Sequence, residues 1–335
     1  MEIDGGIGMD PKGVIEAAKQ AELVGYDGFW VPETSHDPFL PLALAAEHTE
    51  RITLGTGIAV AFARNPMNLA VVANDLQTMS QGRFVLGLGS QIKPHIEKRF
   101  SMQWSHPAPR MRELILAMRA IWASWSDRSR LAFRGEFYRH TLMTPMFDPG
   151  PNEFGNPKVF LAAVGEVMTE VAGEVADGLL AHGFTTERYL REVSIPAFER
   201  GLARGGRSRE DVQISCPGMV VTGPDEEAFA AAATAVKRQL AFYGSTPAYR
   251  PVLELHGWGD LQPELNTLSK RGQWAEMAEL IDDDVLNAFA VVGELDEIPG
   301  KILARFGSLV DRFSFYTPYH VDPERWAEVL AKFKA

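Results

Sequence analysis

The feature of this sequence that most constrains its fold is a regular alternation of short apolar runs and longer amphipathic stretches. Eight runs have the length and character of buried strands: 2–7, 27–31, 52–60, 84–88, 158–164, 178–184, 212–222 and 311–317. Helical patterns lie between them, at 11–24, 66–80, 110–125, 166–177, 187–204, 225–243 and 323–334. Strands that alternate with helices predict a parallel sheet, and eight is the number that closes a barrel. We therefore expect an α/β fold, a (β/α)8 TIM barrel, with a doubly wound open sheet as the alternative.

Two stretches are longer than the connections of a minimal barrel. Residues 126–157 carry the turn-rich run FDPGPNEFGNP, and residues 244–292 contain GSTPAYRP and a helix-like run at 273–287. We interpret them as insertions after the fourth and seventh strands of one domain that spans residues 1–335. In a barrel, segments that follow strands lie on the catalytic face, so both are candidates for a lid or a binding element.

Charge and motif content exclude several classes of function. The 335 residues include 33 basic and 44 acidic side chains, a net charge of −11, without a basic cluster, so nucleic acid and anionic membranes are poor partners. The single cysteine, Cys216, the lack of a signal-peptide pattern and the lack of a long apolar run favour a cytoplasmic protein. No zinc-binding, P-loop or G-x-S-x-G motif is present, and we expect no catalytic metal.

The fourth predicted strand ends in Gly87-Leu88-Gly89, which matches the first part of the dinucleotide fingerprint G-x-G-x-x-G. The third glycine is missing because position 92 is Ile, and Lys93-Pro94 interrupts any helix that would follow. A fingerprint needs the strand, the turn and the opening helix together. The two glycines therefore require another explanation than a dinucleotide site.

Four segments together carry a resemblance to a known family: GYDGFWVPE, ITLGTGIAV, NPMNLAVVANDLQTMSQGRFVLGLGS and AGEVADGLL. They resemble the luciferase-like monooxygenase superfamily, and most closely its branch that uses the deazaflavin coenzyme F420. The resemblance implies a (β/α)8 barrel that holds a flat ring at the C-terminal mouth of its strands. It also implies that Gly87 and Gly89 leave room for this ring, and that the peptide bond between Gly57 and Ile58 is cis and places Ile58 behind the ring. The alternative for the two glycines is a crowded corner of the barrel.

The resemblance implies a proton-transferring group at the end of the second strand, in FWVPETSHDPF. Glu33 matches the acid of the family pattern, but Thr34 stands where the family commonly has His. We take Glu33 and His36 as the candidate catalytic residues, because a carboxyl group or an imidazole can exchange a proton with a substrate oxygen. For His36, a surface or helix-capping role is the alternative.

The remaining candidates are placed by location within the family pattern. The turn from the fifth strand into the next helix would cradle the cofactor phosphate, since backbone N–H groups at a helix N-terminus suit an anion. Trp104 is the candidate for a wall of the substrate pocket, and Lys93 and Arg64 are candidates for the anionic tail or are solvated surface cations. The predicted cofactor-binding residues, besides those near the ring, are Ser90, Gln91, Val164, Gly165, Glu166 and Met168.

These observations predict an oxidoreductase that transfers a hydride between coenzyme F420 and a small organic substrate. The first alternative is an FMN-dependent monooxygenase of the same superfamily. A flavin-binding relative without catalysis is a second, supported by Thr34, and a glycosidase with Glu33 as one of two carboxylates is a third. The resemblance also implies a homodimer.

Overall fold

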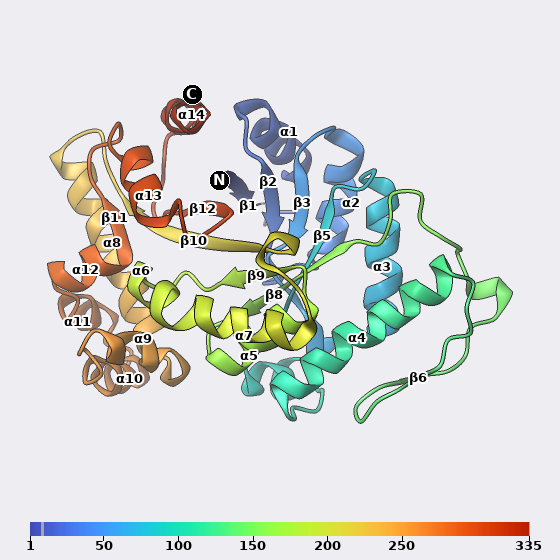
Figure 1. The fold of residues 1–335 in the computed structure, drawn as a ribbon. Helices are drawn as coiled ribbons and strands as arrows, with labels where there is room; N and C mark the ends of the chain where they lie inside the picture. Colours follow the sequence, from blue (N-terminus) through green and yellow to red (C-terminus); the bar gives the residue numbers. More distant parts are fainter. Residues whose placement is uncertain (8–9, 335) are drawn as a thin grey trace.

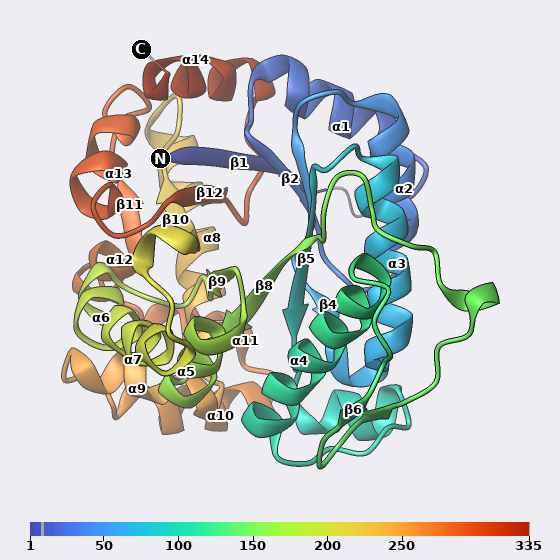
Figure 2. The same ribbon diagram turned by 45° about the vertical axis from the view of Figure 1, so that its right-hand side comes forward.

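The computed structural model describes residues 1–7 and 10–334 and confirms the predicted barrel. Its parallel strands pair in a closed ring, because β1 pairs with β2 on one side and with β12 on the other. Closure excludes the doubly wound open sheet. Figures 1 and 2 show the strands at the centre with helices around them. The eight barrel strands are β1 (Glu2–Ile7), β2 (Gly28–Val31), β3 (Thr53–Thr56), β5 (Phe84–Gly89), β8 (Lys158–Ala163), β9 (Gly178–Ala181), β10 (Gln213–Val221) and β12 (Arg312–Tyr316).

Most of the surrounding helices bury an apolar stripe on their inner side. In the first of them, Val14, Ala18 and Ala21 are buried at helical spacing, and Gly25 ends the helix in the left-handed region at a φ of 100°. Within the described residues, no helix has both the length and the apolar character that crossing a membrane requires. The helices are α1 (Val14–Val24), α2 (Phe39–His48), α3 (Pro66–Met79), α4 (Pro107–Ser126), α5 (Glu166–Val175), α6 (Glu187–Tyr189), α7 (Ile195–Gly205), α8 (Glu226–Gly244), α13 (Ile298–Phe306) and α14 (Pro323–Phe333).

The two long segments singled out in the sequence contain secondary structure of their own. The first forms a small hairpin, β6 (Phe133–Arg134) and β7 (Arg139–His140), at the edge of the molecule beyond α4 (Figure 1). The second forms α9 (Arg250–Leu255), α10 (Leu261–Lys270), α11 (Trp274–Glu279), α12 (Asp283–Phe289) and the strand β11 (Ala290–Val292), which pairs with β10. These helices gather beside α8 around a second hydrophobic cluster (Figures 1 and 2). That both segments are insertions into one domain stays a prediction.

The interior of the barrel holds an ion pair beneath an aromatic ring. Asp4 in β1 and Arg312 in β12 are 0% and 3% exposed, and two hydrogen bonds of 2.9 and 2.5 Å join the guanidinium to the carboxylate. The ring of Trp30 lies 6.0 Å from the guanidinium carbon. Glycines make room for these large groups: a Cβ at Gly28 would lie 2.3 Å from the Asp4 carboxylate, and one at Gly55 would lie 2.4 Å from the Trp30 ring. The barrel is therefore a packed core, and any ligand site has to lie at its mouth.

Candidate active site at the mouth of the barrel

The C-terminal ends of β3 and β5 form one wall of the mouth. The peptide bond between Gly57 and Ile58 is cis, as the resemblance implied. Ile58 is half-buried, and a Cβ at Gly89 would lie 2.7 Å from its side chain, so these two residues are in direct contact. In this wall, the side chain of Ile58 lies against Gly89. A ring against this wall stays a prediction.

Packing within the protein explains why position 87 is a glycine. A Cβ there would lie 1.9 Å from the carbonyl oxygen of Thr56 and 2.9 Å from the side chain of Leu180. The hydroxyl of Thr56 also donates a hydrogen bond of 2.6 Å to the carbonyl of Gly87. Close packing inside the barrel therefore accounts for this glycine, which was the alternative explanation in the sequence, and a cofactor contact at Gly87 stays a prediction.

The carboxylate of Glu33 is held by the same wall. Glu33 is 9% exposed, and its Oε2 accepts hydrogen bonds from the backbone N–H of Val60 at 2.7 Å and from Arg64 at 2.6 Å. The backbone N–H of Glu33 donates to the carbonyl of Ile58 at 3.1 Å. Arg64 also donates to Asp37 at 3.0 Å. This side chain fastens the end of β2 to the segment that follows the cis bond, and Arg64 is engaged by protein carboxylates.

The other candidate of the second strand lies apart from this arrangement. His36 is exposed in the loop that precedes α2, and the structure gives no hydrogen bond between it and Glu33. The carbonyl of Thr34 accepts a hydrogen bond from Arg99, which ends the π-helical turn His95–Arg99 after β5. The structure thus brings Glu33 to the cis segment, whereas it leaves His36 at the surface.

The loop after β5 forms the rim next to this wall. Ser90 and Gln91 are half-buried, and Gln91 has a φ of 58° and a hydrogen bond of 3.0 Å between its Oε1 and the ring of His95. Lys93 is exposed and lies 3.9 Å from Glu97. Trp104 packs edge-on against Phe62 of the segment after the cis bond, with ring centroids 5.6 Å apart. Trp104 is therefore close to the predicted ring wall, and its contact with a substrate stays a prediction.

The turn between β8 and α5 starts a helix without a side-chain cap. Gly165 caps the helix without a side chain, and no atom lies within 4 Å of the position that a Cβ would take. The first N–H groups of a helix have no partner within the helix, so this turn offers free donors next to Val164 and Met168. The carboxylate of Glu166 pairs with Arg200 of α7 at 2.8 Å, which directs its charge toward α7. An acid beside a phosphate would repel it, and this pairing reduces the repulsion by Glu166.

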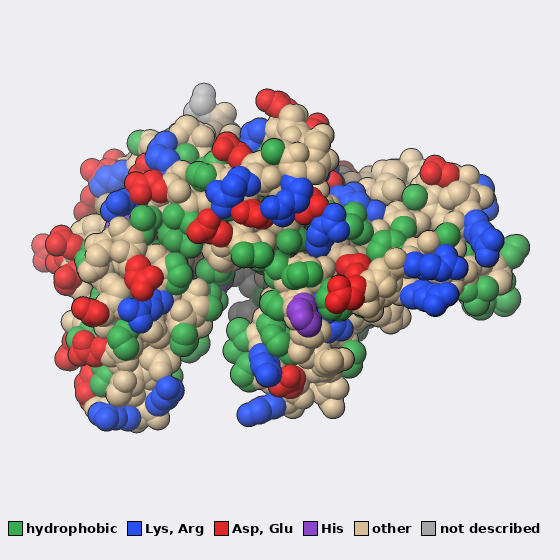
Figure 3. Space-filling model, turned by 60° about the horizontal axis from the view of Figure 1, so that its bottom comes forward, with side chains coloured by type: hydrophobic (Ala, Val, Ile, Leu, Met, Phe, Trp, Pro, Cys, Tyr) green, Lys and Arg blue, Asp and Glu red, His purple; other side chains and the backbone are tan. Residues whose placement is uncertain are grey.

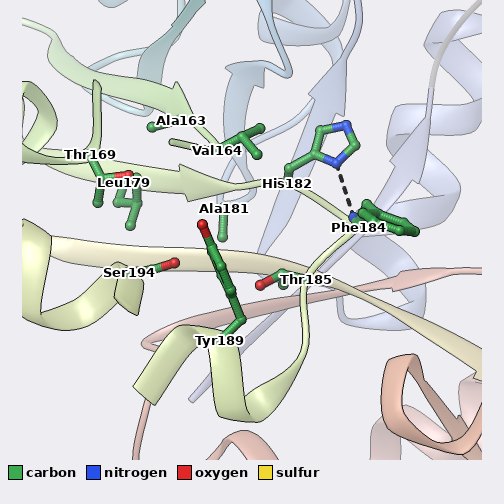
Figure 4. Close-up of a pocket in the computed structure, with 10 residues that line it drawn as sticks. All are labelled: Ala163, Val164, Thr169, Leu179, Ala181, His182, Phe184, Thr185, Tyr189 and Ser194. Atoms are coloured by element: carbon green, nitrogen blue, oxygen red, sulfur yellow. Dashed lines mark hydrogen bonds between the residues drawn. The ribbon is translucent and has the colours of Figure 1, made fainter. Parts of the chain in front are cut away.

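The opposite wall is an aromatic group that the sequence did not point to. His182 directly follows β9; its Nδ1 lies 3.0 Å from the backbone nitrogen of Phe184, as Figure 4 shows, and its Nε2 lies 3.2 Å from the hydroxyl of Tyr249. The rings of Tyr243 and Tyr249 lie 4.9 and 4.6 Å from the imidazole. The hydroxyl of Tyr243 is 2.9 Å from that of Tyr316, at the end of β12. We call His182, Tyr243, Tyr249 and Tyr316 the tyrosine wall.

The tyrosine wall is electrically neutral at ordinary pH. Burial lowers the pKa of His182 to about 4 and raises the pKa of Tyr249 to about 12. Burial also raises the pKa values of Tyr243 and Tyr316. A small cavity that borders His182 is lined by further hydroxyl groups, those of Thr169, Thr185, Tyr189 and Ser194 (Figure 4). In the described part of the chain, no group of His, Cys, Asp and Glu side chains has the arrangement of a metal site.

Figure 3 shows a hollow between two lobes on the lower side of the molecule, with hydrophobic side chains along both of its sides. The left lobe occupies the place of α9 to α11 in Figure 1.

Sequence patterns located the first wall through its glycines. The tyrosine wall combines residues from four separate segments, and the available signal was the position of His182 within the sixth predicted strand, 178–184.

Comparison with protein families and relatives gives a consistent result. A family model described as luciferase-like monooxygenase matches residues 2–312. An uncharacterised protein of Mycobacterium tuberculosis is 60% identical over 312 residues, which cover 93% of this chain and 92% of the relative. A 5,10-methylenetetrahydromethanopterin reductase of Archaeoglobus fulgidus is 27% identical over 322 residues, which cover 94% of this chain and 92% of the relative.

Solved structures show the same fold at lower sequence identity. The coenzyme F420-dependent tetrahydromethanopterin reductase of Methanopyrus kandleri superposes with a TM-score of 0.78 at 20% identity and covers 98% of both chains. The oxygenating constituent of 3,6-diketocamphane monooxygenase from Pseudomonas putida, in complex with FMN, has a TM-score of 0.68 at 18% identity, covering 98% of this chain and 96% of that one. The fold thus occurs with either cofactor.

Proposed function

The chain belongs to the luciferase-like monooxygenase family, and from this premise we propose that it is an oxidoreductase dependent on coenzyme F420. The reaction would be hydride transfer between the cofactor and a small organic substrate. The observation that carries the proposal is the pairing, at one mouth, of an open helix N-terminus with a wall formed by Ile58 and Gly89. Similarity to a 5,10-methylenetetrahydromethanopterin reductase and to an F420-dependent reductase supports the choice of the deazaflavin.

The residues at the turn into α5 fit a phosphate group. Gly165 has open space where other residues carry a Cβ, and Glu166 is paired with Arg200. The free N–H groups of the first helical turn and the positive end of the helix dipole both favour an anion. We therefore assign the cofactor phosphate to the backbone of Val164, Gly165 and Glu166, with Met168 on the adjacent turn.

The residues of the wall at the ends of β3 and β5 fit a flat apolar ring. Ile58 offers a half-buried aliphatic surface, and Gly89 allows a close approach of the strand beside it. When bound, coenzyme F420 supplies or accepts a hydride at C5 of the deazaflavin. The protein orients the reactants and keeps water out, and Ser90, Gln91 and Trp104 form the rim on this side.

Glu33 has a positioning role in this proposal. Its Oε2 accepts the N–H of Val60 and the guanidinium of Arg64, so the carboxylate holds the segment that carries Ile58. Arg64 in turn pairs with Asp37 and is not assigned to the cofactor tail. His36, exposed in the neighbouring loop, is the remaining candidate of this strand for proton exchange with a substrate oxygen.

A second candidate function is that of an FMN-dependent monooxygenase. The observation that favours it is the likeness to an FMN-bound monooxygenase component, and the same α5 turn would suit the phosphate of FMN. A relative that binds a flavin without catalysis is the third reading, for which Thr34 is the sequence feature. We also propose a homodimer, which the family resemblance implies.

Replacing Gly165 by Asp is expected to weaken F420 binding strongly. The added carboxylate would stand at the helix N-terminus where we place the phosphate, and open space around Gly165 lets it fit without disturbing the fold. Asp and Asn both serve well as helix N-caps, so neither substitution should lower stability. We expect the Asp variant to bind F420 at least about tenfold more weakly than the Asn variant, measured by fluorescence titration.

The Asn variant is the matched control, because it has the same shape without the charge. The difference between the two variants isolates electrostatic repulsion of the phosphate from steric effects. Equal affinities of the Asp and Asn variants for F420, with both proteins folded, would place the phosphate elsewhere than at this turn.

A further inference from the structure

The tyrosine wall has two hydroxyl protons for which the described residues provide no acceptor. We propose that the hydroxyl groups of Tyr249 and Tyr316 form a binding site for a neutral carbonyl oxygen of the substrate. This inference deepens the proposed function, because it names the chemical class that the hydride partner would belong to. It stands on hydrogen-bond geometry that is independent of the cofactor wall.

The protonation of His182 follows from its partner on one side. A backbone N–H can only donate, and the N–H of Phe184 lies 3.0 Å from Nδ1 of His182 (Figure 4). Nδ1 is therefore the accepting nitrogen, and in the neutral ring the proton is on Nε2. Because burial lowers the pKa of His182 to about 4, the neutral ring is the relevant form at ordinary pH.

The direction of the next hydrogen bond is then fixed. Nε2–H of His182 donates to the hydroxyl oxygen of Tyr249 at 3.2 Å. A hydroxyl that accepts this bond still has its own proton to donate. Among the described residues, no side chain or carbonyl accepts the proton of Tyr249, and the residue is half-buried. His182 is thus a positioning residue that orients Tyr249 and leaves its proton available.

The pair formed by Tyr243 and Tyr316 also has one hydroxyl proton to spare. The oxygens of Tyr243 and Tyr316 are 2.9 Å apart, so one proton is used between them and one is left over. Either hydroxyl can be the donor in this bond, so the spare proton belongs to the pair, and we assign it to Tyr316, the member that ends a barrel strand.

Tyr316 and His182, which holds Tyr249, lie at the C-terminal ends of barrel strands, where ligands bind in this architecture. Tyr316 ends β12, and His182 directly follows β9. The loop after β9 packs against β10 and β12, because a Cβ at Gly183 would lie 3.5 Å from the ring of Tyr316 and 3.7 Å from Pro217. Tyr249 reaches this place from the segment between α8 and α9, as the hydrogen bond to His182 shows.

The surroundings favour a neutral acceptor over a carboxylate. The ring contacts of the wall are with Phe184, Phe242 and with one another, and among the described residues no Arg or Lys is stacked on its rings. A carboxylate here would lose its hydration without gaining a counter-ion, which is costly. A carbonyl oxygen has two lone pairs, can accept two hydroxyl donors and carries no full charge. Since burial raises the pKa of Tyr249 to about 12, the donor keeps its proton.

The test uses the full-length protein with 3-fluorotyrosine in place of its seven tyrosines and observes it by ¹⁹F NMR. The Tyr249, Tyr316 and Tyr26 resonances are assigned by their loss in the Tyr249→Phe, Tyr316→Phe and Tyr26→Phe variants. Cyclohexanone is the probe, and methylenecyclohexane is the matched compound without oxygen. We expect cyclohexanone to shift the Tyr249 and Tyr316 resonances saturably and to leave that of Tyr26, beneath β1, in place. Methylenecyclohexane should leave the Tyr249 and Tyr316 resonances nearly unchanged.

Absence of a shift at Tyr249 and Tyr316 with excess cyclohexanone would overturn the inference, as would equal shifts with methylenecyclohexane. A further readout is the affinity of cyclohexanone for the Tyr249→Phe variant, which we expect to fall at least about fivefold, whereas F420 affinity stays unchanged. F420 is titrated in parallel with the wild-type protein. Shifts with cyclohexanone but no F420 binding would contradict the proposed function and leave this inference intact. F420 binding without these shifts would be consistent with the proposed function and would overturn this inference.

Discussion

The Arg312→Ala variant is expected to lose about 3–5 kcal/mol of its free energy of unfolding. Removal of the guanidinium leaves the carboxylate of Asp4 fully buried in the barrel without its two hydrogen bonds. Burial already opposes both charges, since it raises the pKa of Asp4 and lowers that of Arg312 to about 10, so the two are tolerated together as a pair. Urea denaturation of the two proteins at pH 7 measures the difference.

Arg188→Ala is the control for this measurement. It removes an ion pair with Glu192 in which both side chains are about half exposed, 51% and 47%. Such a surface pair contributes about 0.5 kcal/mol. A loss in Arg312→Ala as small as that of the control would contradict the view that the barrel interior depends on this pair.

The Glu33→Ala variant is expected to lose about 3 kcal/mol of stability and to bind F420 at least about tenfold more weakly. The substitution leaves the buried N–H of Val60 without its acceptor and Arg64 without its closest carboxylate. The segment after the cis bond, which carries Ile58, would lose its attachment to the end of β2. Denaturation and a fluorescence titration of F420 at equal protein concentrations measure the two effects.

Glu97→Ala serves as the comparison, because it removes a carboxylate from the rim on the same side of the mouth. Glu97 is exposed and lies 3.9 Å from Lys93, so we expect little change in stability or affinity. If Glu33→Ala kept full stability and full F420 affinity, the carboxylate would not hold this wall, and a direct role in proton transfer would become the better explanation.

The sequence was sufficient for the barrel, because most strands are largely apolar runs and most helices show a clear apolar stripe. It did not predict α2 (Phe39–His48), which contains a proline near its start. Pro41 lies in the first turn of this helix, where a missing backbone N–H costs no hydrogen bond, although it usually signals a break. The continuous helix predicted over 187–204 contains a π-helical stretch, Leu190–Ser194, between α6 and α7. Local patterns do not report such a change of hydrogen-bond period.

Local geometry was predictable where a sequence pattern or the family resemblance specified it, and the roles of these residues in a site stay predictions. The cis bond between Gly57 and Ile58 was one such case, and the open turn at Gly165 was another. The role of Glu33 depends on Arg64, which lies 31 positions away. Tyr249 meets His182 across 67 positions. Pairings at such distances are set by the closure of the barrel and by the path of the long segments, which composition and periodicity leave open.

The measurement that tests the central claim most directly is a pair of titrations of the wild-type protein, one with coenzyme F420 and one with FMN. Quenching of tryptophan fluorescence reports binding in both. We predict saturable binding of F420, with an affinity at least about tenfold higher than that for FMN. Tighter binding of FMN would contradict the F420 assignment and favour a flavin monooxygenase, and binding of neither would contradict a cofactor site at this mouth.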